Sequence, residues 1–309
     1  MRRLRLGAVV VLLALGAAWP HQATAWGRDG HMVIGAVAYA RLRAEDPAAL
    51  AAVLTALRQH PHYADLLRGP DEWALDVDDA DLAIFMQASR WADDVRSGRY
   101  EEFGRSNWHY VNYHLREGRL DPPGAPERDG FLLDALKRNH ARVRSNDPTE
   151  RAIALTWLFH LVGDSHQPLH NIANHAPEHP NGDRGGNLFY VRVEAAADTI
   201  NLHWLWDDLV IGSNRFSDVR QRAIMLRNQP GLRPHELAEQ TSELDFSTWI
   251  RDGAEIAVEH VYRNGALRGG TRERGTLLPA GYTASVQPIA HERATLAGYR
   301  LARLLSDAF

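Results

Sequence analysis

The chain has 309 residues, with 35 basic and 39 acidic side chains, 16 histidines and no cysteine. A net charge of −4 argues against a protein that binds nucleic acid mainly through a lysine- and arginine-rich surface, because such a protein would be basic. The lack of cysteine excludes disulfides and thiolate ligands. Any zinc must therefore be bound by His, Asp and backbone groups, which is typical of catalytic zinc sites.

Residues 1–25 have the features of an export signal. Three arginines precede an apolar run at 6–18 that is too short to span a membrane, and Ala23-Thr24-Ala25 is a small-residue cleavage site. We expect cleavage after Ala25, a mature chain that begins at Trp26, and a soluble protein in the periplasm or outside the cell. Subtracting three arginines from 35 basic residues leaves 32 against 39 acidic ones, a net charge of −7. If this protein handles phosphates, bound metal is the obvious source of positive charge.

Apolar residues recur at helical spacing along most of the mature chain. The pattern predicts a single, mainly α domain over 26–309, a helical bundle with one small β-hairpin. Residues 187–193 alternate between apolar and polar and are the only convincing strand. The helices are expected at 32–42, 47–57, 80–90, 131–144, 149–163, 199–209, 247–262 and 290–305.

The segment from 156 to 187 holds the first candidate metal ligands. His160 and Asp164 are four residues apart, so on a helix their side chains project from one face. Pro168 ends the helix, and His170 follows two residues later, where it can fold back toward the same point. A His/Asp pair and a third His in this arrangement suit a cation such as zinc.

A second pair with the same spacing, His203 and Asp207, follows in the sequence NLHWLWDDLV. One such pair could be two hydrogen-bonded core residues, but two pairs favour metal binding. Other candidates stand beside Trp, Pro or Gly residues: His31, Asp93 and His109. Together these eight His and Asp side chains are too many for one tetrahedral zinc and suit two or three.

These motifs together resemble the secreted S-one/P-one nuclease family of fungi, plants and bacteria, whose members are zinc-dependent single-strand-specific nucleases and 3′-nucleotidases. The resemblance covers nearly all of the mature chain. Its motifs are Trp26-Gly with His31, SRWAD at 89–93, WHYVN at 108–112, HLVGDSHQPLH at 160–170, GGN at 185–187 and NLHWLWD at 201–207. The expected fold is the helical bundle shared by these nucleases and zinc-dependent phospholipase C.

The resemblance implies three zinc ions and assigns a ligand set to each. The first set would be Asp93, His109, His160 and Asp164. The second would be His170, His203 and Asp207. The third would be His31, Asp164 as a bridge, and the α-amino group and carbonyl oxygen of Trp26. A metal readily deprotonates an α-amino group, so cleavage of the leader would complete the third site.

The resemblance also implies roles for residues around the metals. Two zinc ions that share Asp164 would supply hydroxide near neutral pH, and the products would carry 5′-phosphates. Arg96 would stabilise the phosphate in the transition state; the alternative is a surface arginine that pairs with Asp94. Tyr110 and Asn112 would form a nucleobase pocket, with Asn112 in place of the usual Asp. Asn187 would lie near the substrate, although the GGN motif is equally consistent with a turn before a strand.

Two alternative functions remain open from the sequence. A zinc-dependent phospholipase C has a similar fold and metal site, but the NLHxxWD and WHYVN motifs and Arg96 favour the nuclease. A non-catalytic periplasmic zinc-binding protein would carry exchangeable zinc, and no His-rich loop supports it. We expect single-stranded nucleic acid and nucleotides as substrates, three zinc ions as cofactors, and neither a membrane anchor nor an obligate protein partner.

Overall fold

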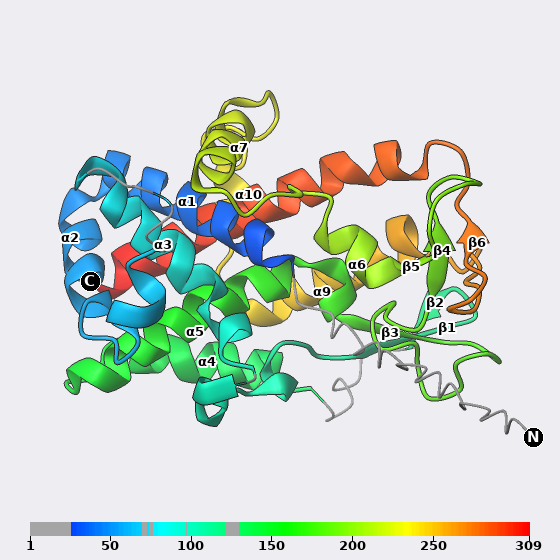
Figure 1. Cartoon of the computed structure of the whole chain (residues 1–309), viewed down its shortest axis with the longest axis horizontal. Helices are drawn as coiled ribbons and strands as arrows, with labels where there is room; N and C mark the ends of the chain where they lie inside the picture. The colour runs from blue at the N-terminus through cyan, green and yellow to red at the C-terminus, as the bar shows by residue number, and fades with distance from the viewer. Residues whose placement is uncertain (1–25, 70–72, 74–76, 97, 122–129) are drawn as a thin grey trace, which may run out of the picture.

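The computed structural model describes residues 26–69, 73, 77–96, 98–121 and 130–309. The predicted leader, residues 1–25, lies outside the described residues. The described part is mainly α-helical, which confirms the predicted fold class (Figure 1). The α-helices are α1 (Arg28–Glu45), α2 (Pro47–Leu57), α3 (Val77–Asp94), α4 (Leu132–Arg142), α5 (Pro148–His166), α6 (Leu202–Asp207), α7 (Phe216–Asn228), α8 (Ala238–Ser242), α9 (Phe246–Ile256) and α10 (Tyr282–Ala308).

Short 3₁₀ and π segments connect these helices. They are η1 (Tyr63–Leu67), η3 (Gly98–Phe103), η4 (Ser106–Trp108), η5 (Pro168–His170) and η6 (Ala257–Val261). Two of them, η4 and η5, adjoin predicted metal ligands. His109 follows η4 directly, and His170 is the last residue of η5.

Helix α5 has clear start and stop signals. Asp147 caps it by accepting hydrogen bonds from the backbone N–H groups of Thr149 and Glu150, and Pro148 occupies the first turn, where its missing N–H costs nothing. The helix ends at His166 because Gln167 is extended before Pro168. His160 and Asp164 are therefore both in its last two turns, as predicted.

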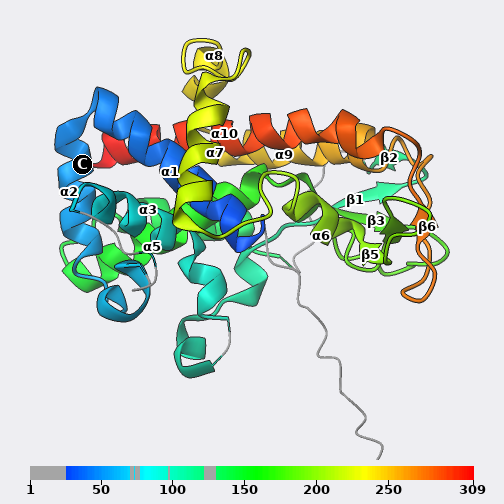
Figure 2. The same ribbon diagram turned by 45° about the horizontal axis from the view of Figure 1, so that its top comes forward.

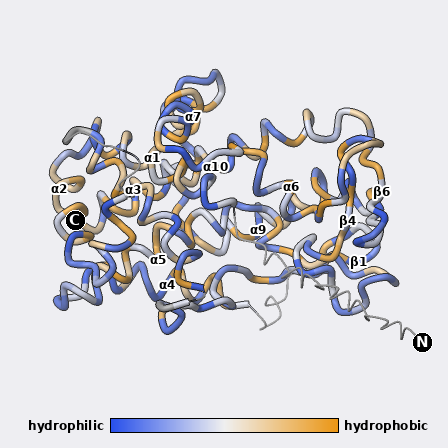
Figure 3. Tube along the Cα trace, viewed as in Figure 1, coloured by the Kyte–Doolittle hydropathy of each residue, from blue (hydrophilic) through white to orange (hydrophobic). Residues whose placement is uncertain are grey.

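The helices α1, α3, α5 and α10 cross closely in the centre of the molecule, and Figure 3 shows hydrophobic and hydrophilic residues interspersed along them. Gly35 and Gly298 permit this approach. A Cβ atom at Gly35 would lie 2.6 Å from the carbonyl oxygen of Phe85 in α3, and one at Gly298 would lie 2.6 Å from the Cβ of Val37 in α1. Close crossings of this kind place side chains from several helices around one point.

The prediction of one small hairpin understated the β structure. The described residues form two three-stranded sheets, with strand orders β2-β1-β3 and β5-β4-β6. The bounds are β1 (Tyr113–Arg116), β2 (Arg119–Leu120), β3 (Ile172–His175), β4 (Tyr190–Arg192), β5 (Ile200–Asn201) and β6 (Thr276–Leu277). The strand predicted over 187–193 corresponds to β4, which pairs antiparallel with β5. The parallel pairs β1–β3 and β4–β6 join segments far apart in sequence, so local patterning could not reveal them.

The other boundary differences involve helices. α7 was not predicted; together with α8 it stands out from the rest of the molecule in Figure 2. α10 begins at Tyr282, eight residues before the predicted start, and carries Pro288 within it. In the part of the chain that the structure describes, no helix has both the length and the apolar character needed to cross a membrane.

Candidate active site

Six segments bring the eight predicted His and Asp ligands to the inside of the molecule. α5 supplies two of them, α6 two, and α1, α3, η5 and the residue after η4 one each. All eight are buried, with exposed fractions of 4 % or less: His31, Asp93, His109, His160, Asp164, His170, His203 and Asp207. Their ligand atoms form three groups that could each hold a metal ion: His31 with His160 and Asp164, Asp93 with His109 and His160, and His170 with His203 and Asp207.

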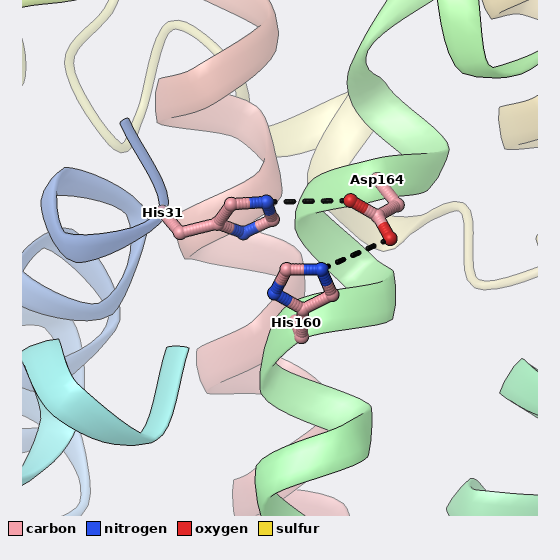
Figure 4. Close-up of side chains that lie close together, drawn as sticks. All are labelled: His31, His160 and Asp164. Atoms are coloured by element: carbon pink, nitrogen blue, oxygen red, sulfur yellow. Dashed lines mark ion pairs between the residues drawn. The ribbon is translucent and has the colours of Figure 1, made fainter. Parts of the chain in front are cut away.

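Asp164 lies at the centre of the first group. Its Oδ1 is 3.3 Å from His31 Nε2, and its Oδ2 is 3.2 Å from His160 Nε2, as Figure 4 shows. The rings of His31 and His160 stack with their centroids 3.9 Å apart. Ligands about 2.0–2.1 Å from a tetrahedral zinc ion lie roughly 3.3 Å from one another. These separations are therefore those of ligands that share a cation.

The second group shares His160 with the first. His160 Nε2 is 2.9 Å from His109 Nδ1 and 3.7 Å from Asp93 Oδ1. Asp164 also reaches this group, because its Oδ2 is 3.0 Å from His109 Nδ1. The carboxylate of Asp164 thus contacts ligands of two neighbouring groups, as expected for a bridging ligand.

In the third group, two imidazoles face each other through nitrogen lone pairs. His170 Nδ1 donates a hydrogen bond to the carbonyl of His109, and His203 Nδ1 donates to the carbonyl of Gly185 at 2.6 Å. Each neutral ring therefore keeps a lone pair on Nε2, and the two Nε2 atoms are 3.1 Å apart. Asp207 Oδ2 lies 3.7 Å from His203 Nε2. Two facing lone pairs require a proton or a metal ion between them.

Unsatisfied polar atoms support a metal over protons. Several buried ligand atoms have no hydrogen-bond partner among the described residues. They are both ring nitrogens of His31, both carboxylate oxygens of Asp93, and Oδ1 of Asp164. Buried polar groups without partners are costly. Metal ions held by these nitrogen and oxygen ligands would satisfy them, so the residues fit zinc.

The pKa values of His31, His109 and His203 agree with neutral imidazoles, and that of Asp164 agrees with a charged carboxylate. Burial lowers the pKa of His31 to about 4 and those of His109 and His203 to about 3. Burial alone would raise the pKa of Asp164, but the surrounding histidines lower it well below its usual range. Burial raises the pKa of Asp207 well above the usual value, a cost that a bound cation would remove.

Trp26 is fully buried beside Asp164. Its indole Nε1 donates a hydrogen bond of 3.0 Å to the carbonyl of Gly163, and the N–H of Gly27 donates to the carbonyl of Asp207 at 3.3 Å. Gly163 is needed here, because a Cβ atom at this position would lie 2.6 Å from Nδ1 of His31. Trp26 is thereby anchored by its side chain at α5, one residue before Asp164, and the following residue, Gly27, is anchored at Asp207.

Arg96 points toward the second group. Its Nε is 3.2 Å from Oδ1 of Asp93 and 3.4 Å from Nε2 of His109. Asp94, the predicted alternative partner, instead pairs with Arg90 at 2.9 Å and with Arg28 at 3.2 Å. The guanidinium is thus in position to meet an anion bound at these ligands.

The predicted substrate residues are less closely tied to the metal groups. Tyr110 follows His109 directly and is half-buried, whereas Asn112 is buried. The side chain of Asn187 donates a hydrogen bond to the carbonyl of Arg184 at 2.8 Å and closes a turn. This contact favours the turn interpretation of the GGN motif over direct substrate binding.

The groups that orient the ligands were not predicted from the sequence. The carbonyl of Ser89 accepts a hydrogen bond from Nδ1 of His160 at 2.9 Å, and the side chain of Gln167 donates to Asp207 at 2.8 Å. Gly185 has φ +59°, and a Cβ atom there would lie 2.2 Å from the carbonyl oxygen of Leu169. Glycine at 185 therefore lets its own carbonyl reach His203. The SRWAD, HQPLH and GGN motifs contain these residues, but backbone acceptors leave no mark in sequence.

Comparisons with known proteins decide the family. A model of the S1/P1 nuclease family matches residues 26–309. The chain belongs to the S1/P1 nuclease family. It is 25 % identical to Endonuclease 5 of Arabidopsis thaliana over 99 % of the chain and 97 % of that protein. It is also 25 % identical to Nuclease S1 of Aspergillus oryzae, over 74 % of the chain and 80 % of that protein.

Membership of the S1/P1 nuclease family confirms the predicted reaction class. The protein is a hydrolase of phosphodiester bonds and a single-strand-specific nuclease, and its family depends on zinc. The several buried His and Asp groups agree with that dependence. The nucleic-acid substrate follows from the family as well, and the match favours the nuclease over the phospholipase alternative.

Proposed function

We propose that this nuclease holds three zinc ions and that their ligands are the three residue sets predicted from the sequence. The strongest support is the pair of facing Nε2 lone pairs of His170 and His203, 3.1 Å apart, each fixed by a backbone carbonyl on the other ring nitrogen. The contacts of Asp164 with His31, His109 and His160 support a bridging role for its carboxylate.

The third zinc would be completed by the mature N-terminus. Trp26 is held by its indole at Gly163, one residue before Asp164, and the family match begins at Trp26. Cleavage after Ala25 would free the α-amino group at this position, where a metal could deprotonate it. The leader would direct export of the protein and be removed in the process. A chain with an uncleaved leader would lack one ligand of the third zinc.

Bound zinc supplies an activated water molecule near neutral pH and stabilises negative charge on phosphate oxygens. The chain's own residues hold and orient the reactants. Asp164 keeps two ligand groups together, while Ser89 fixes the ring of His160. Arg96, beside Asp93 and His109, would donate hydrogen bonds to the phosphate as its charge increases. The products would carry 5′-phosphates, and 3′-nucleotides would also be hydrolysed.

The base of the substrate would stack on Tyr110, next to the ligand His109. Stacking is tolerant of sequence because every base has a π-face, and it contributes about 1–3 kcal/mol per base. Asn112 would both donate and accept hydrogen bonds at the base edge. Asn187 would contribute through the turn that it closes with Arg184.

Hydrolysis by the zinc-loaded mature protein tests this proposal. Single-stranded DNA and RNA, duplex DNA and phosphatidylcholine are compared with and without a chelator. Chelator-sensitive release of 5′-mononucleotides from single strands is the expected result. Turnover of the lipid alone would assign the same ligands to a phospholipase C. Binding of zinc with no turnover of any substrate would indicate a non-catalytic zinc-binding protein.

A further inference from the structure

A half-buried tryptophan lies beside two exposed arginines at the edge of the metal site. The guanidinium carbon of Arg138, in α4, is 5.5 Å from the ring centroid of Trp108, and that of Arg105 is 5.9 Å from the same ring. Part of the Trp108 side chain and both guanidinium groups are open to solvent. We call Arg105, Trp108 and Arg138 the Arg–Trp strip.

No acidic side chain among the described residues neutralises the positive charge of the strip. Within that part of the chain, Arg105 donates hydrogen bonds only to the carbonyls of Glu102 and Gly104, and Arg138 contacts only the ring of Trp108. The described acids nearest in sequence, Glu102 and Asp134, form no ion pair with either arginine. In a chain with a net charge of −4, two adjacent arginines of this kind form a local anion-attracting surface.

The strip is continuous with the metal site. The rings of Trp108 and His109 both pack on Trp157, with centroid separations of 4.8 Å and 5.5 Å. Phe131 extends the strip on the other side, because its N–H donates a hydrogen bond of 2.7 Å to the carbonyl of Asn107. Phe131, the N-cap residue of α4, is 39 % exposed and stands seven residues before Arg138.

We propose that the Arg–Trp strip binds the sugar-phosphate backbone of a single strand beyond the bond that is cleaved, and that Phe131 stacks on one of its bases. This inference rests on the proposed function, because the strand must enter the metal site beside His109. Arginines that track phosphates next to exposed aromatic rings are the features that bind single strands without sequence preference. The strip would make the enzyme prefer polynucleotides to a dinucleoside monophosphate, which has no phosphate beyond the bond that is cleaved.

The expected effect can be calculated from counterion release. When the logarithm of affinity is plotted against the logarithm of salt concentration, the slope reports how many phosphates the protein contacts. On a single strand, each phosphate that an arginine binds adds about −0.7 to this slope. At 0.1 M salt, removing one such arginine should weaken affinity by about fivefold, and removing two should weaken it by about 25-fold. The effect should disappear as salt approaches 1 M.

The test compares two substrates on the zinc-loaded enzyme. One is a dinucleoside monophosphate, which offers only the scissile bond, and the other is a 12-residue oligothymidylate. R105Q/R138Q should leave kcat/KM for the dinucleoside monophosphate unchanged. It should lower kcat/KM for the oligothymidylate by about 25-fold at 0.1 M salt and reduce its salt slope by about 1.4.

Three further variants define the cause. R105K/R138K keeps both charges and should retain most of the activity on the oligothymidylate. R215Q/R303Q removes two exposed arginines from the start of α7 and from α10 and should behave as the wild type; α7 lies across the molecule from α4 (Figure 1). F131A should lower kcat/KM for the oligothymidylate by about fivefold, the lower bound for one stacked base.

Three results would overturn the inference. If R105Q/R138Q lowers kcat/KM equally for both substrates, or for neither, the strip does not bind the extended strand. The same holds if R215Q/R303Q reproduces its effect. If the wild type hydrolyses neither substrate, the proposed function itself fails, so the two failures are distinguishable.

Discussion

Two buried polar clusters adjoin the last turns of α5: one presents ligand atoms that could hold metal ions, and the other does not. His160 and Asp164 face the metal groups, where several ligand atoms converge without hydrogen-bond partners in the described residues. His166, two residues after Asp164, is also fully buried, but it donates through Nδ1 to the carbonyl of Val162 and accepts through Nε2 from Arg300. Both of its nitrogens are occupied, so no lone pair is left for a cation.

The His166 cluster is completed by a second buried arginine. Arg293 donates to the carbonyls of His166 and Trp249, while Arg300 donates to the carbonyl of Gln240 and lies 4.8 Å from the ring of Trp249. These bonds tie the end of α5 to α9 and α10. Both clusters contain fully buried histidine, but the metal groups combine it with carboxylates and the His166 cluster combines it with arginines. The use of each imidazole lone pair then separates a candidate metal site from a structural cluster.

The largest effect is expected from D164N. The carboxylate contacts His31, His109 and His160, so its loss should disturb two ligand groups together. We expect nuclease activity to fall by at least about 10³-fold, because a catalytic metal contributes several kcal/mol. Zinc content and kcat/KM on single-stranded DNA measure this. A variant with full zinc and more than a tenth of the activity would show that Asp164 is not shared.

H166N is expected to affect stability instead of chemistry. Asn can still donate to Val162 but leaves Arg300 without its imidazole acceptor. The free energy of unfolding should fall by about 2–3 kcal/mol, the cost of an unsatisfied buried charged donor. Denaturant unfolding gives that value, and zinc analysis of the folded variant should give the wild-type content. Loss of zinc from a folded H166N protein would contradict the distinction between the clusters.

Q167L tests the groups that orient the ligands. Gln167 donates to Oδ1 of Asp207, whose other oxygen faces His203. Removing such a partner typically lowers metal affinity by about 10–100-fold. Competition with a chelator should show one zinc released more easily from Q167L than from the wild type. Unchanged zinc affinity would mean that Asp207 is positioned by other contacts.

The smallest effect is a change in pH dependence. Burial, together with Arg293 and Arg300, lowers the pKa of His166 well below its usual value. The unfolded chain therefore binds a proton below about pH 6.5 that the folded chain does not. This contribution to stability is complete above about pH 6.5 and is lost as pH falls toward the lower folded pKa. As the pH falls below about 6.5, the free energy of unfolding of the wild type should therefore decrease more steeply than that of H166N, by up to about 1.4 kcal/mol per pH unit.

Unfolding of both proteins from pH 7 to pH 5 measures this difference. The comparison between variant and wild type removes the contribution of zinc release, which is common to both. If the free energies of unfolding of the two proteins change with pH in parallel, the pKa of His166 is not lowered in the folded state.

The sequence predicted what local spacing determines. The i,i+4 pairs His160/Asp164 and His203/Asp207 lie on single helices, so helical periodicity was sufficient to predict that each pair shares a face. Their positions beside Trp, Pro or Gly residues singled out His31, Asp93 and His109, which are remote in the sequence, and the resemblance to known nucleases assigned them to ligand sets. The structure brings them to within hydrogen-bond or ion-pair distance of the α5 ligands.

Features that depend on tertiary contacts were not predictable. The parallel pairing of β1 with β3 joins Tyr113 to Ile172 and has no local signal. The carbonyls of Ser89 and Gly185 orient ligands through backbone atoms, which any residue carries. The Arg–Trp strip depends on the packing of α4 against η4, so nothing in the sequence links Arg138 to Trp108.

Anomalous diffraction at the zinc absorption edge, from crystals of the mature protein, tests the central claim most directly. We predict three peaks for each chain. One lies among Asp93, His109, His160 and Asp164; one among His170, His203 and Asp207; and one among His31, Asp164 and the N-terminus at Trp26. No peak between His170 and His203, or a peak at His166, would contradict the account.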